Sequence, residues 1–297
     1  MLHRTRLVWP VVTALVLSAS VLLAQDRTAP AAATAVLRTV AIPDANTVKD
    51  DQQKIAKWLA GKTGVQVEFL EVKDYAAAVT ALATGKAELG WLGGVTTVQA
   101  MQQSKGKVGP FVTTDNNLHF KSYVIANKSL GAKTLEDLKG KTFTFGNKTS
   151  TSGHIMARYS LEQKGVDAEK FFAKVAYSGN HTNTVLNVAG GAVDCGALNY
   201  STFDKMVADK KAEIEKVQIV WTTPEYVDYA WNVRSDVDEK FGAGTLQKIK
   251  QAFLSLDSKK PEDQAILKIH GAKKYEECKP IQWDGIRAVL DKVDITK

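Results

Sequence analysis

Short apolar runs alternate with stretches of helical spacing over most of the chain, and this alternation predicts an α/β fold. Three strand-like runs, at 36–42, 65–71 and 88–92, each precede such a stretch, at about 48–60, 74–83 and 94–103. Asp74 stands where the N-cap of the second helix is expected. Three βα units in succession predict a mostly parallel sheet.

The pattern changes near residues 109–123, where a second α/β region begins. Its strand-like runs are short and lie at 120–126, 142–145, 174–177, 193–198 and 218–221. A return strand at 230–233 leads into mainly helical sequence, which we expect to pack back on the first region. We therefore predict two lobes: lobe one from 36–118 with 226–297, and lobe two from 119–225. Ligands of such sheets bind beyond the carboxyl ends of the strands, so we expect a ligand cleft between the lobes.

The N-terminus has the layout of a secretory signal. A short basic start, an apolar run at 7–23 and the small residue Ala24 predict a cleaved signal peptide over 1–24. The run is near the lower length limit for a bilayer span, so an uncleaved anchor is the alternative. No cysteine follows it, which argues against a lipoprotein anchor. Residues 25–35 are rich in Ala, Thr and Pro and predict a flexible leader.

Composition narrows the class of protein. The chain has 297 residues, of which 44% are hydrophobic and 24% charged, enough for two lobes with their own cores. Its formal net charge is +7, and removal of Arg4 and Arg6 with the signal leaves +5 (7 − 2). This modest excess suits an anionic ligand. The lysines are scattered and form no basic stripe, so we expect no nucleic-acid partner.

The sequence lacks common enzyme and metal motifs. It has no phosphate loop ending in Gly-Lys-Ser/Thr, no nucleophile elbow and no His-Glu-x-x-His. A hydrolase triad of Ser152, His181 and Asp228 can be drawn, but no spacing supports it. The histidines show no metal-ligand spacing, so we expect no metal, no cofactor and no enzyme activity. Spacing leaves open whether Cys195 and Cys278 form a disulfide.

A loop at 146–154 carries the strongest local signal for a binding site. It lies between a predicted strand and a predicted helix and contains the hydroxyl residues Ser150, Thr151 and Ser152. The first backbone N–H groups of a helix have no partner within the helix, and the helix dipole is positive there. Hydroxyls and N–H groups together can hold an anion. A simple N-cap is the alternative, but it needs only one such residue.

Three further loops between a strand and a helix share this design. The loop at 177–182 adds His181, which can donate to an oxyanion, and the loop at 91–97 contains Gly93, Gly94 and Thr96. Asp44 opens the fourth loop, at 44–47. Each could be an ordinary turn or cap. Four donor-rich loops on two lobes favour an anion clamped between the lobes.

Asp228 precedes the predicted return strand. A carboxylate beside an anion is unfavourable unless the anion carries a proton for it to accept. Such a site would favour protonated oxyanions over fully ionised ones. A fully ionised anion would place its negative charge against the carboxylate with no proton between them. The alternative is a solvent-exposed aspartate at the start of a strand.

These segments resemble the phosphate/phosphite/phosphonate family of periplasmic substrate-binding proteins of ABC transporters. The resemblance runs from about residue 36 to the end and is carried by residues 143–153, 177–181 and 193–200. It implies a type II-like, two-lobed periplasmic binding protein with mixed, mostly parallel sheets. It also implies an oxyanion on Ser150, Thr151 and Ser152, with His181 and Asp228 beside it.

Two features of the resemblance bear on the ligand. Family members that bind aminophosphonates use an acidic residue after the strand that ends at residue 198, where this chain has the neutral Asn199 and Tyr200. We therefore expect a compact inorganic oxyanion, at a site that includes both residues. Segments 252–257 and 265–272 look like a selenate-binding branch of the family. A related branch binds arsenite, for which Cys195 is a candidate soft ligand, although strand alternation favours a core position for it.

The resemblance implies a periplasmic protein whose partner is an ABC permease. The alternative partner is the ectodomain of a sensor histidine kinase, and we expect a monomer. The sequence does not decide between transport and sensing, or between the oxyanions of phosphorus, arsenic and selenium.

Overall fold

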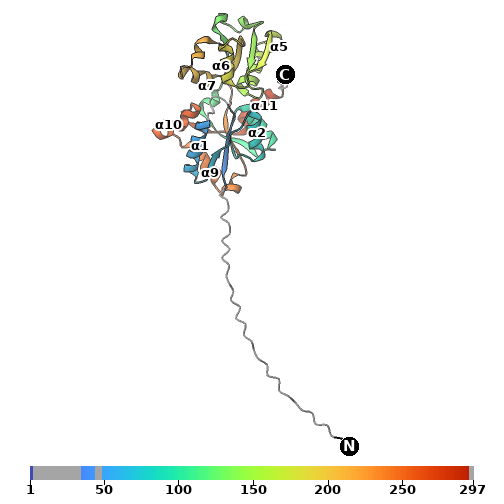
Figure 1. Ribbon diagram of the computed structural model, residues 1–297, viewed down its shortest axis with the longest axis vertical. Helices are drawn as coiled ribbons and strands as arrows, with labels where there is room; N and C mark the ends of the chain where they lie inside the picture. Colours follow the sequence, from blue (N-terminus) through green and yellow to red (C-terminus); the bar gives the residue numbers. More distant parts are fainter. Residues whose placement is uncertain (3–34, 44–48, 294–297) are drawn as a thin grey trace. The chain divides into compact units, whose positions relative to one another are not determined.

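The computed structural model describes residues 1–2, 35–43 and 49–293 of the chain (Figure 1). The predicted signal peptide, apart from its first two residues, most of the predicted leader, and Asp44 lie outside the described residues. Within the described part, no helix has the length and apolar character needed to cross a bilayer.

The first sheet forms the middle of lobe one, in the order β11-β4-β10-β3-β1-β2. Its strands are β1 (Leu37–Ala41), β2 (Val67–Phe69), β3 (Leu89–Leu92), β4 (Val108–Thr114), β10 (Ala230–Arg234) and β11 (Tyr275–Glu277). β1 pairs in parallel with β2 and β3, whereas β10 runs antiparallel to β3 and β4, and β11 antiparallel to β4. The strands of the predicted βα units are therefore parallel as expected, and β10 and β11 make the sheet mixed. The chain re-enters from the other lobe, so β10 enters the sheet from the opposite end.

The second sheet forms the middle of lobe two, in the order β7-β6-β8-β5-β9. Its strands are β5 (Ser122–Asn127), β6 (Thr142–Phe145), β7 (Lys174–Tyr177), β8 (Cys195–Asn199) and β9 (Val217–Thr222). β6 is parallel to β7 and β8, and β5 is antiparallel to β8 and β9. Successive β5 residues enter different cores: Val124 packs with Phe143 on one face, and Ile125 packs with Val185 on the other.

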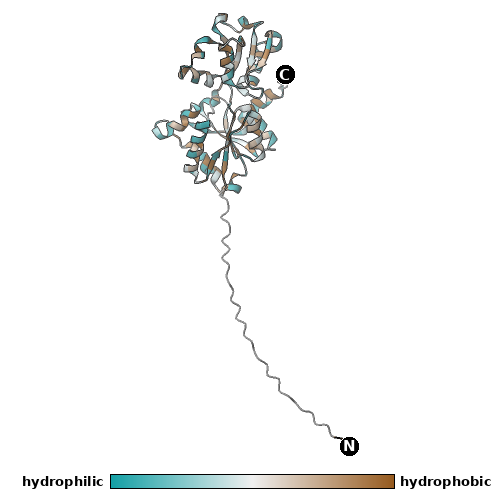
Figure 2. Ribbon diagram, in the orientation of Figure 1, coloured by the Kyte–Doolittle hydropathy of each residue, from teal (hydrophilic) through white to brown (hydrophobic). Residues whose placement is uncertain are grey.

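Helices cover both sheets (Figures 1 and 2). They are α1 (Lys49–Thr63), α2 (Tyr75–Thr84), α3 (Gly94–Gln103), α4 (Met156–Gln163), α5 (Ala168–Phe171), α6 (His181–Ala189), α7 (Tyr200–Ala208), α8 (Val237–Phe241), α9 (Thr245–Leu254), α10 (Pro261–Leu267) and α11 (Asp284–Leu290). Shorter helical turns are η1 (Asp115–His119), η2 (Lys128–Leu130), η3 (Glu136–Leu138), η4 (Thr151–Ile155), η5 (Ala212–Lys216), η6 (Lys268–His270) and η7 (Pro280–Trp283).

Local sequence explains how α2 begins and ends. The Asp74 side chain accepts a hydrogen bond from the Ala77 backbone N–H at 2.7 Å, so the predicted N-cap is confirmed. Gly85 ends the helix with φ 78°, a left-handed conformation that glycine adopts at little cost.

The C-terminal helices do not all pack on lobe one as expected. α9 packs against α1 and β4, both in lobe one. α11 contacts α3 of lobe one but also η4 and α4 of lobe two. An apolar cluster around Trp283 and Ile286 includes Val95 from lobe one and Ile155 from lobe two. The last helix therefore packs against both lobes.

Candidate anion-binding site

The loop rich in serine and threonine follows β6 and leads into η4, a single π-helical turn. Ser150 is the N-cap of this turn, and its Oγ accepts a hydrogen bond from the Gly153 N–H at 3.0 Å. Thr151 and Ser152 form the first positions of the turn, and both are buried. Among the described residues, their backbone N–H groups have no hydrogen-bond acceptor. Ser150 is thus used as a cap, and the next two residues present backbone donors.

His181 is the first residue of α6 and is 0% exposed. Its Nδ1 lies 3.2 Å from the backbone nitrogen of Asn199, which can only donate. Nδ1 is therefore the acceptor, and the neutral ring carries its proton on Nε2. Burial lowers the pKa of His181 to about 3, so the ring stays neutral near pH 7. Within the described part of the chain, Nε2 has no hydrogen-bond partner, which leaves a buried N–H donor without an acceptor.

The His181 ring lies against the turn that bears the hydroxyl residues. A Cβ added to Gly153 would lie 2.9 Å from His181 Cε1 and 3.2 Å from the Cα of Gly146. Glycine at position 153 therefore permits the close approach of the imidazole. Thr182, next to His181, has a buried hydroxyl that also finds no partner among the residues described. The loops after β6 and β7 thus bring several donors together.

Asp228 is fully buried, so the alternative of a solvent-exposed aspartate is wrong. Its Oδ1 accepts a hydrogen bond from the Gly94 N–H at 2.7 Å. The next backbone N–H of α3, that of Val95, donates to Thr151 Oγ1 at 2.9 Å. A Cβ on Gly93 would lie 3.2 Å from both the Asp228 and Thr151 oxygens. The positive end of α3 thus meets the Asp228 carboxylate of lobe one and the Thr151 hydroxyl of lobe two.

The predicted donors of the α3 loop are engaged within the protein. Gly94 donates to Asp228, and Thr96 Oγ1 donates to the Gly93 carbonyl at 2.9 Å. These residues hold Asp228 and the helix start in place. Their role as direct ligand donors stays a prediction.

Two residues at the site, Ser122 and Tyr226, were missed by sequence reasoning. Ser122 Oγ donates to the Ser152 carbonyl at 2.7 Å and lies 2.6 Å from Tyr226 Oη. Because the single Ser122 proton points to that carbonyl, Tyr226 is the donor to Ser122. Burial and the nearby Asp228 carboxylate raise the pKa of Tyr226 well above its usual value, so the phenol keeps its proton. Tyr226 lies two residues from Asp228 in the sequence, whereas nothing local marks Ser122.

Asn199 and Tyr200 support the site from the end of β8. Asn199 is buried; its Oδ1 accepts from the Thr202 N–H at 2.7 Å, and its Nδ2 donates to Tyr229 Oη at 3.3 Å. Its amide is therefore largely used in capping α7 and holding Tyr229. The Tyr200 ring packs edge-on against Phe120, with the ring centroids 4.8 Å apart, and burial raises its pKa to about 12. Ligand contact by either residue stays a prediction.

The two cysteines are free and buried. Cys195 belongs to the core of lobe two, and its Sγ lies 3.3 Å from the Thr142 carbonyl oxygen. Burial raises the pKa of this thiol, which disfavours the thiolate that a soft ligand requires. Among the described residues, no group of three or more His, Cys, Asp or Glu could hold a metal ion.

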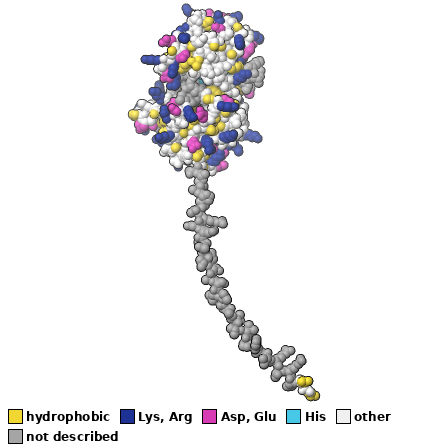
Figure 3. All heavy atoms as spheres, viewed as in Figure 1, with side chains coloured by type: hydrophobic (Ala, Val, Ile, Leu, Met, Phe, Trp, Pro, Cys, Tyr) yellow, Lys and Arg dark blue, Asp and Glu magenta, His cyan; other side chains and the backbone are white. Residues whose placement is uncertain are grey.

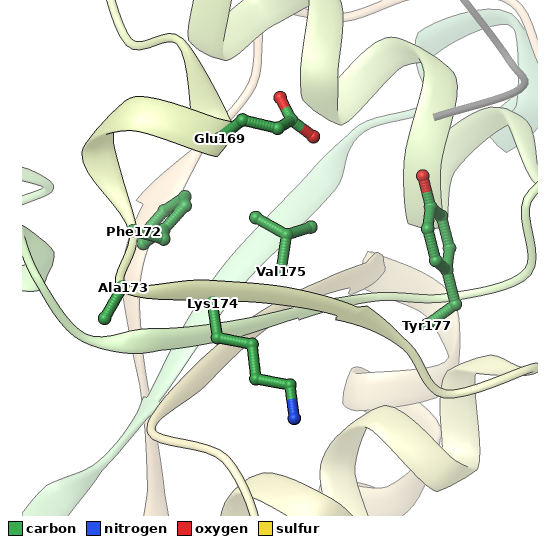
Figure 4. Close-up of a pocket in the computed structure, with 6 residues that line it drawn as sticks. All are labelled: Glu169, Phe172, Ala173, Lys174, Val175 and Tyr177. Carbon is green, nitrogen blue, oxygen red and sulfur yellow. The ribbon is translucent and has the colours of Figure 1, made fainter.

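A hollow elsewhere on lobe two has a different character (Figure 4). It is lined by Glu169, Phe172, Ala173, Lys174, Val175 and Tyr177. The carboxylate of Glu169 in this hollow pairs with Arg158 at 2.6 Å. Lysines and arginines on the face seen in Figure 3 are interspersed with acidic residues. Neither the hollow nor this charged face brings hydrogen-bond donors together as the loops after β6 and β7 do. We therefore place the candidate anion site at those loops.

Two α/β lobes that meet over a buried set of hydrogen-bond donors define a ligand-binding protein of the periplasmic type. The model of the family described as "ABC transporter, phosphonate, periplasmic substrate-binding protein" matches residues 40–283. The chain belongs to this family. It is a periplasmic substrate-binding component of an ABC transporter, and it is not an enzyme.

Two similar proteins agree with this assignment. The chain is 34% identical over 268 residues to the probable ABC transporter phosphite binding protein PhnD1 of Prochlorococcus marinus, covering 87% of this chain and 90% of that protein. The structure of that protein in complex with methylphosphonate matches with a TM-score of 0.82 over 87% of this chain and 99% of the other. The phosphonates-binding periplasmic protein of Escherichia coli is 27% identical over 76% of this chain and 67% of its own length.

Proposed function

We propose that this protein captures a small phosphorus oxyanion that carries one proton, such as phosphite or methylphosphonate, for an ABC importer. The observation that carries the proposal is the buried Nε2–H of His181, which has no acceptor among the described residues. A bound oxyanion would supply that acceptor. It would also accept from the Thr151 and Ser152 backbone N–H groups.

The buried Asp228 carboxylate supports a protonated ligand. A monoanion of phosphite or methylphosphonate keeps one P–OH, which can donate to a carboxylate. Sulfate and selenate are fully ionised near neutral pH and would place a like charge against Asp228 with no proton between them. We therefore propose that the site rejects these two anions. The names of the relatives, which refer to phosphite and phosphonates, support the same ligand class.

The remaining features follow from this role. We propose that residues 1–24 are a cleaved export signal, and that lobe one (36–118 with 226–297) and lobe two (119–225) close on the ligand as a monomer. The buried Cys195 offers arsenite no exposed thiolate, and no contact described above favours a sensor kinase over a permease.

A thermal-shift screen of the mature protein tests the proposal. The panel holds phosphite, methylphosphonate, phosphate, sulfate, selenate and arsenite. A ligand at 100 times its dissociation constant stabilises the fold by about 2.7 kcal/mol, which gives a clear shift. We expect a shift with phosphite or methylphosphonate that is lost in His181→Ala and kept in the control His119→Ala, an exposed histidine paired with Glu225. A shift with sulfate or selenate alone, or with no anion, would contradict the proposal.

A further inference from the structure

The C-terminal segment 278–293 reaches the candidate site, a contact that the sequence did not predict. Trp283 is 0% exposed, and its indole Nε1 donates to the backbone carbonyl of Asp228 at 2.9 Å. The same Asp228 receives the Gly94 N–H on its carboxylate. The indole thus fixes the backbone of the residue whose side chain meets the start of α3.

A second contact of the segment bears on Gly94 itself. A Cβ added to Gly94 would lie 2.2 Å from Ile286 Cδ1 and 3.3 Å from both Trp283 Cδ1 and Thr151 Cγ2. Three segments of the chain therefore meet at this one glycine: the start of α3, the C-terminal segment and the hydroxyl-bearing turn. Gly94 permits the contact because it has no side chain.

The segment also packs on lobe two. After the buried Cys278, its buried positions are Trp283, Ile286, Val289 and Val293, which are spaced so that they fall along one side of a helix. They share an apolar cluster with Val95 and Val98 of α3 and with Ile155 of η4. α11 contacts α4 as well. One short segment therefore touches the start of α3, the Asp228 backbone and the turn that carries Thr151.

We propose that Trp283 is a positioning residue for Asp228, and that Ile286 holds the start of α3 against it. Through these two contacts the C-terminal segment sets where the Asp228 carboxylate lies relative to Gly94 and Thr151. The part of this inference that concerns affinity rests on the proposed function. The part that concerns the Asp228–Gly94 hydrogen bond does not.

The physical basis is the fixed geometry of a buried hydrogen bond. Trp283→Phe keeps a six-membered aromatic ring but removes the indole N–H, so the buried Asp228 carbonyl loses the hydrogen bond that Trp283 donates. The loop that bears Asp228 then shifts to satisfy that carbonyl, and its carboxylate moves relative to the Gly94 N–H. Ile286→Val trims the methyl group that rests on Gly94 and serves as a milder second variant.

The first test needs no ligand. The Gly94 amide proton is followed by NMR in the full mature protein, where a 2.7 Å bond to a carboxylate gives a shifted, slowly exchanging signal. We expect Trp283→Phe and Ile286→Val to speed its exchange, while Trp58→Phe leaves it unchanged. Trp58 is a fair control because it packs edge-on against Phe253 in lobe one, with the ring centroids 5.2 Å apart. An unchanged Gly94 signal in both variants would overturn the positioning role.

The second test is a double-mutant cycle on phosphite affinity, measured by calorimetry. If Trp283 acts through Asp228, Trp283→Phe weakens binding about three- to tenfold in the wild-type background and has little effect in an Asp228→Asn background. An equal loss in both backgrounds would show general packing and overturn the inference. If the wild-type protein binds no phosphite, the proposed function fails, and the Gly94 signal alone still decides the positioning role.

Discussion

The Nδ1 atom of His181 accepts a hydrogen bond from the Asn199 backbone N–H at 3.2 Å, which fixes the proton of the neutral ring on Nε2. The end of β8 thus orients a donor that belongs to α6. Ring orientation and tautomer are both set before any ligand arrives. Binding of a ligand therefore requires no rearrangement of this side chain.

Replacing His181 tests this donor. His181→Ala removes one hydrogen bond to a charged group and should weaken oxyanion binding about 10- to 100-fold. His181→Gln keeps an N–H donor but lacks the rigid ring that Asn199 orients, so we expect an intermediate affinity. Titration calorimetry with phosphite gives both values. Equal affinities for wild type and His181→Ala would mean that the ring does not touch the ligand.

Stability should fall in acid because three histidines are buried in their neutral forms. Burial lowers the pKa of His181 and of His270 to about 3, and that of His154 to about 4, from a usual value of 6.5. Between these values and 6.5 the unfolded chain takes up protons that the folded chain does not. The contribution of these neutral histidines to the free energy of unfolding is therefore complete above pH 6.5 and is lost as the pH falls.

Between its pKa in the folded protein and 6.5, each of these histidines should lower the free energy of unfolding by about 1.4 kcal/mol for each unit by which the pH falls. Urea unfolding of wild type and His181→Gln at pH 7 and pH 5 measures it. We expect the variant to lose less stability between the two pH values than wild type does. Identical losses would contradict the buried, neutral state of His181.

Gly94 should not tolerate a side chain. In Gly94→Ala the new methyl group would overlap Ile286 Cδ1, and we expect the free energy of unfolding to fall by about 1–3 kcal/mol. Gly61→Ala, in α1, is the control, because no atom lies within 4 Å of the added Cβ. Alanine is favoured over glycine inside a helix, so the control should gain about 0.5–1 kcal/mol. Equal effects in the two variants would mean that the C-terminal segment does not rest on Gly94.

Cys195 should have no part in binding. Its thiol lies in the core of lobe two, so Cys195→Ala should leave phosphite affinity unchanged within about twofold, as expected for a distant site. Thiol reagents should react slowly with the folded protein. Binding of arsenite that disappears in Cys195→Ala but not in Cys278→Ala would show instead that Cys195 is a soft ligand.

The sequence predicted the helix starts and caps that depend on local order. A strand, a polar loop and a helix in succession identify the turn at Thr151 and the loop at His181, because helix starts expose backbone donors wherever they occur. The capping role of Asp74 could be predicted for the same reason. These features need only neighbours in the chain.

The other features of the fold and of the candidate site depend on contacts between segments that are far apart in the sequence. Ser122 and Trp283 reach the site from the first residue of β5 and from the C-terminal segment, and no local pattern marks either residue. The antiparallel course of β10 follows from the return of the chain between lobes, which apolar runs do not specify. Whether Asp228 is buried or exposed was likewise left open, since burial depends on what packs over the loop.

We propose that the site holds an oxyanion with one proton against the Asp228 carboxylate. Calorimetric titration of the mature protein at neutral pH with phosphite and with sulfate, in wild type and Asp228→Asn, tests this proposal. We predict that wild type binds phosphite at least about tenfold more tightly than sulfate, since the phosphite monoanion can donate a proton to the carboxylate whereas sulfate would place a like charge against it. We also predict that Asp228→Asn narrows the difference between the two affinities. Equal binding of the two anions by wild type, or a preference that does not depend on Asp228, would contradict the account.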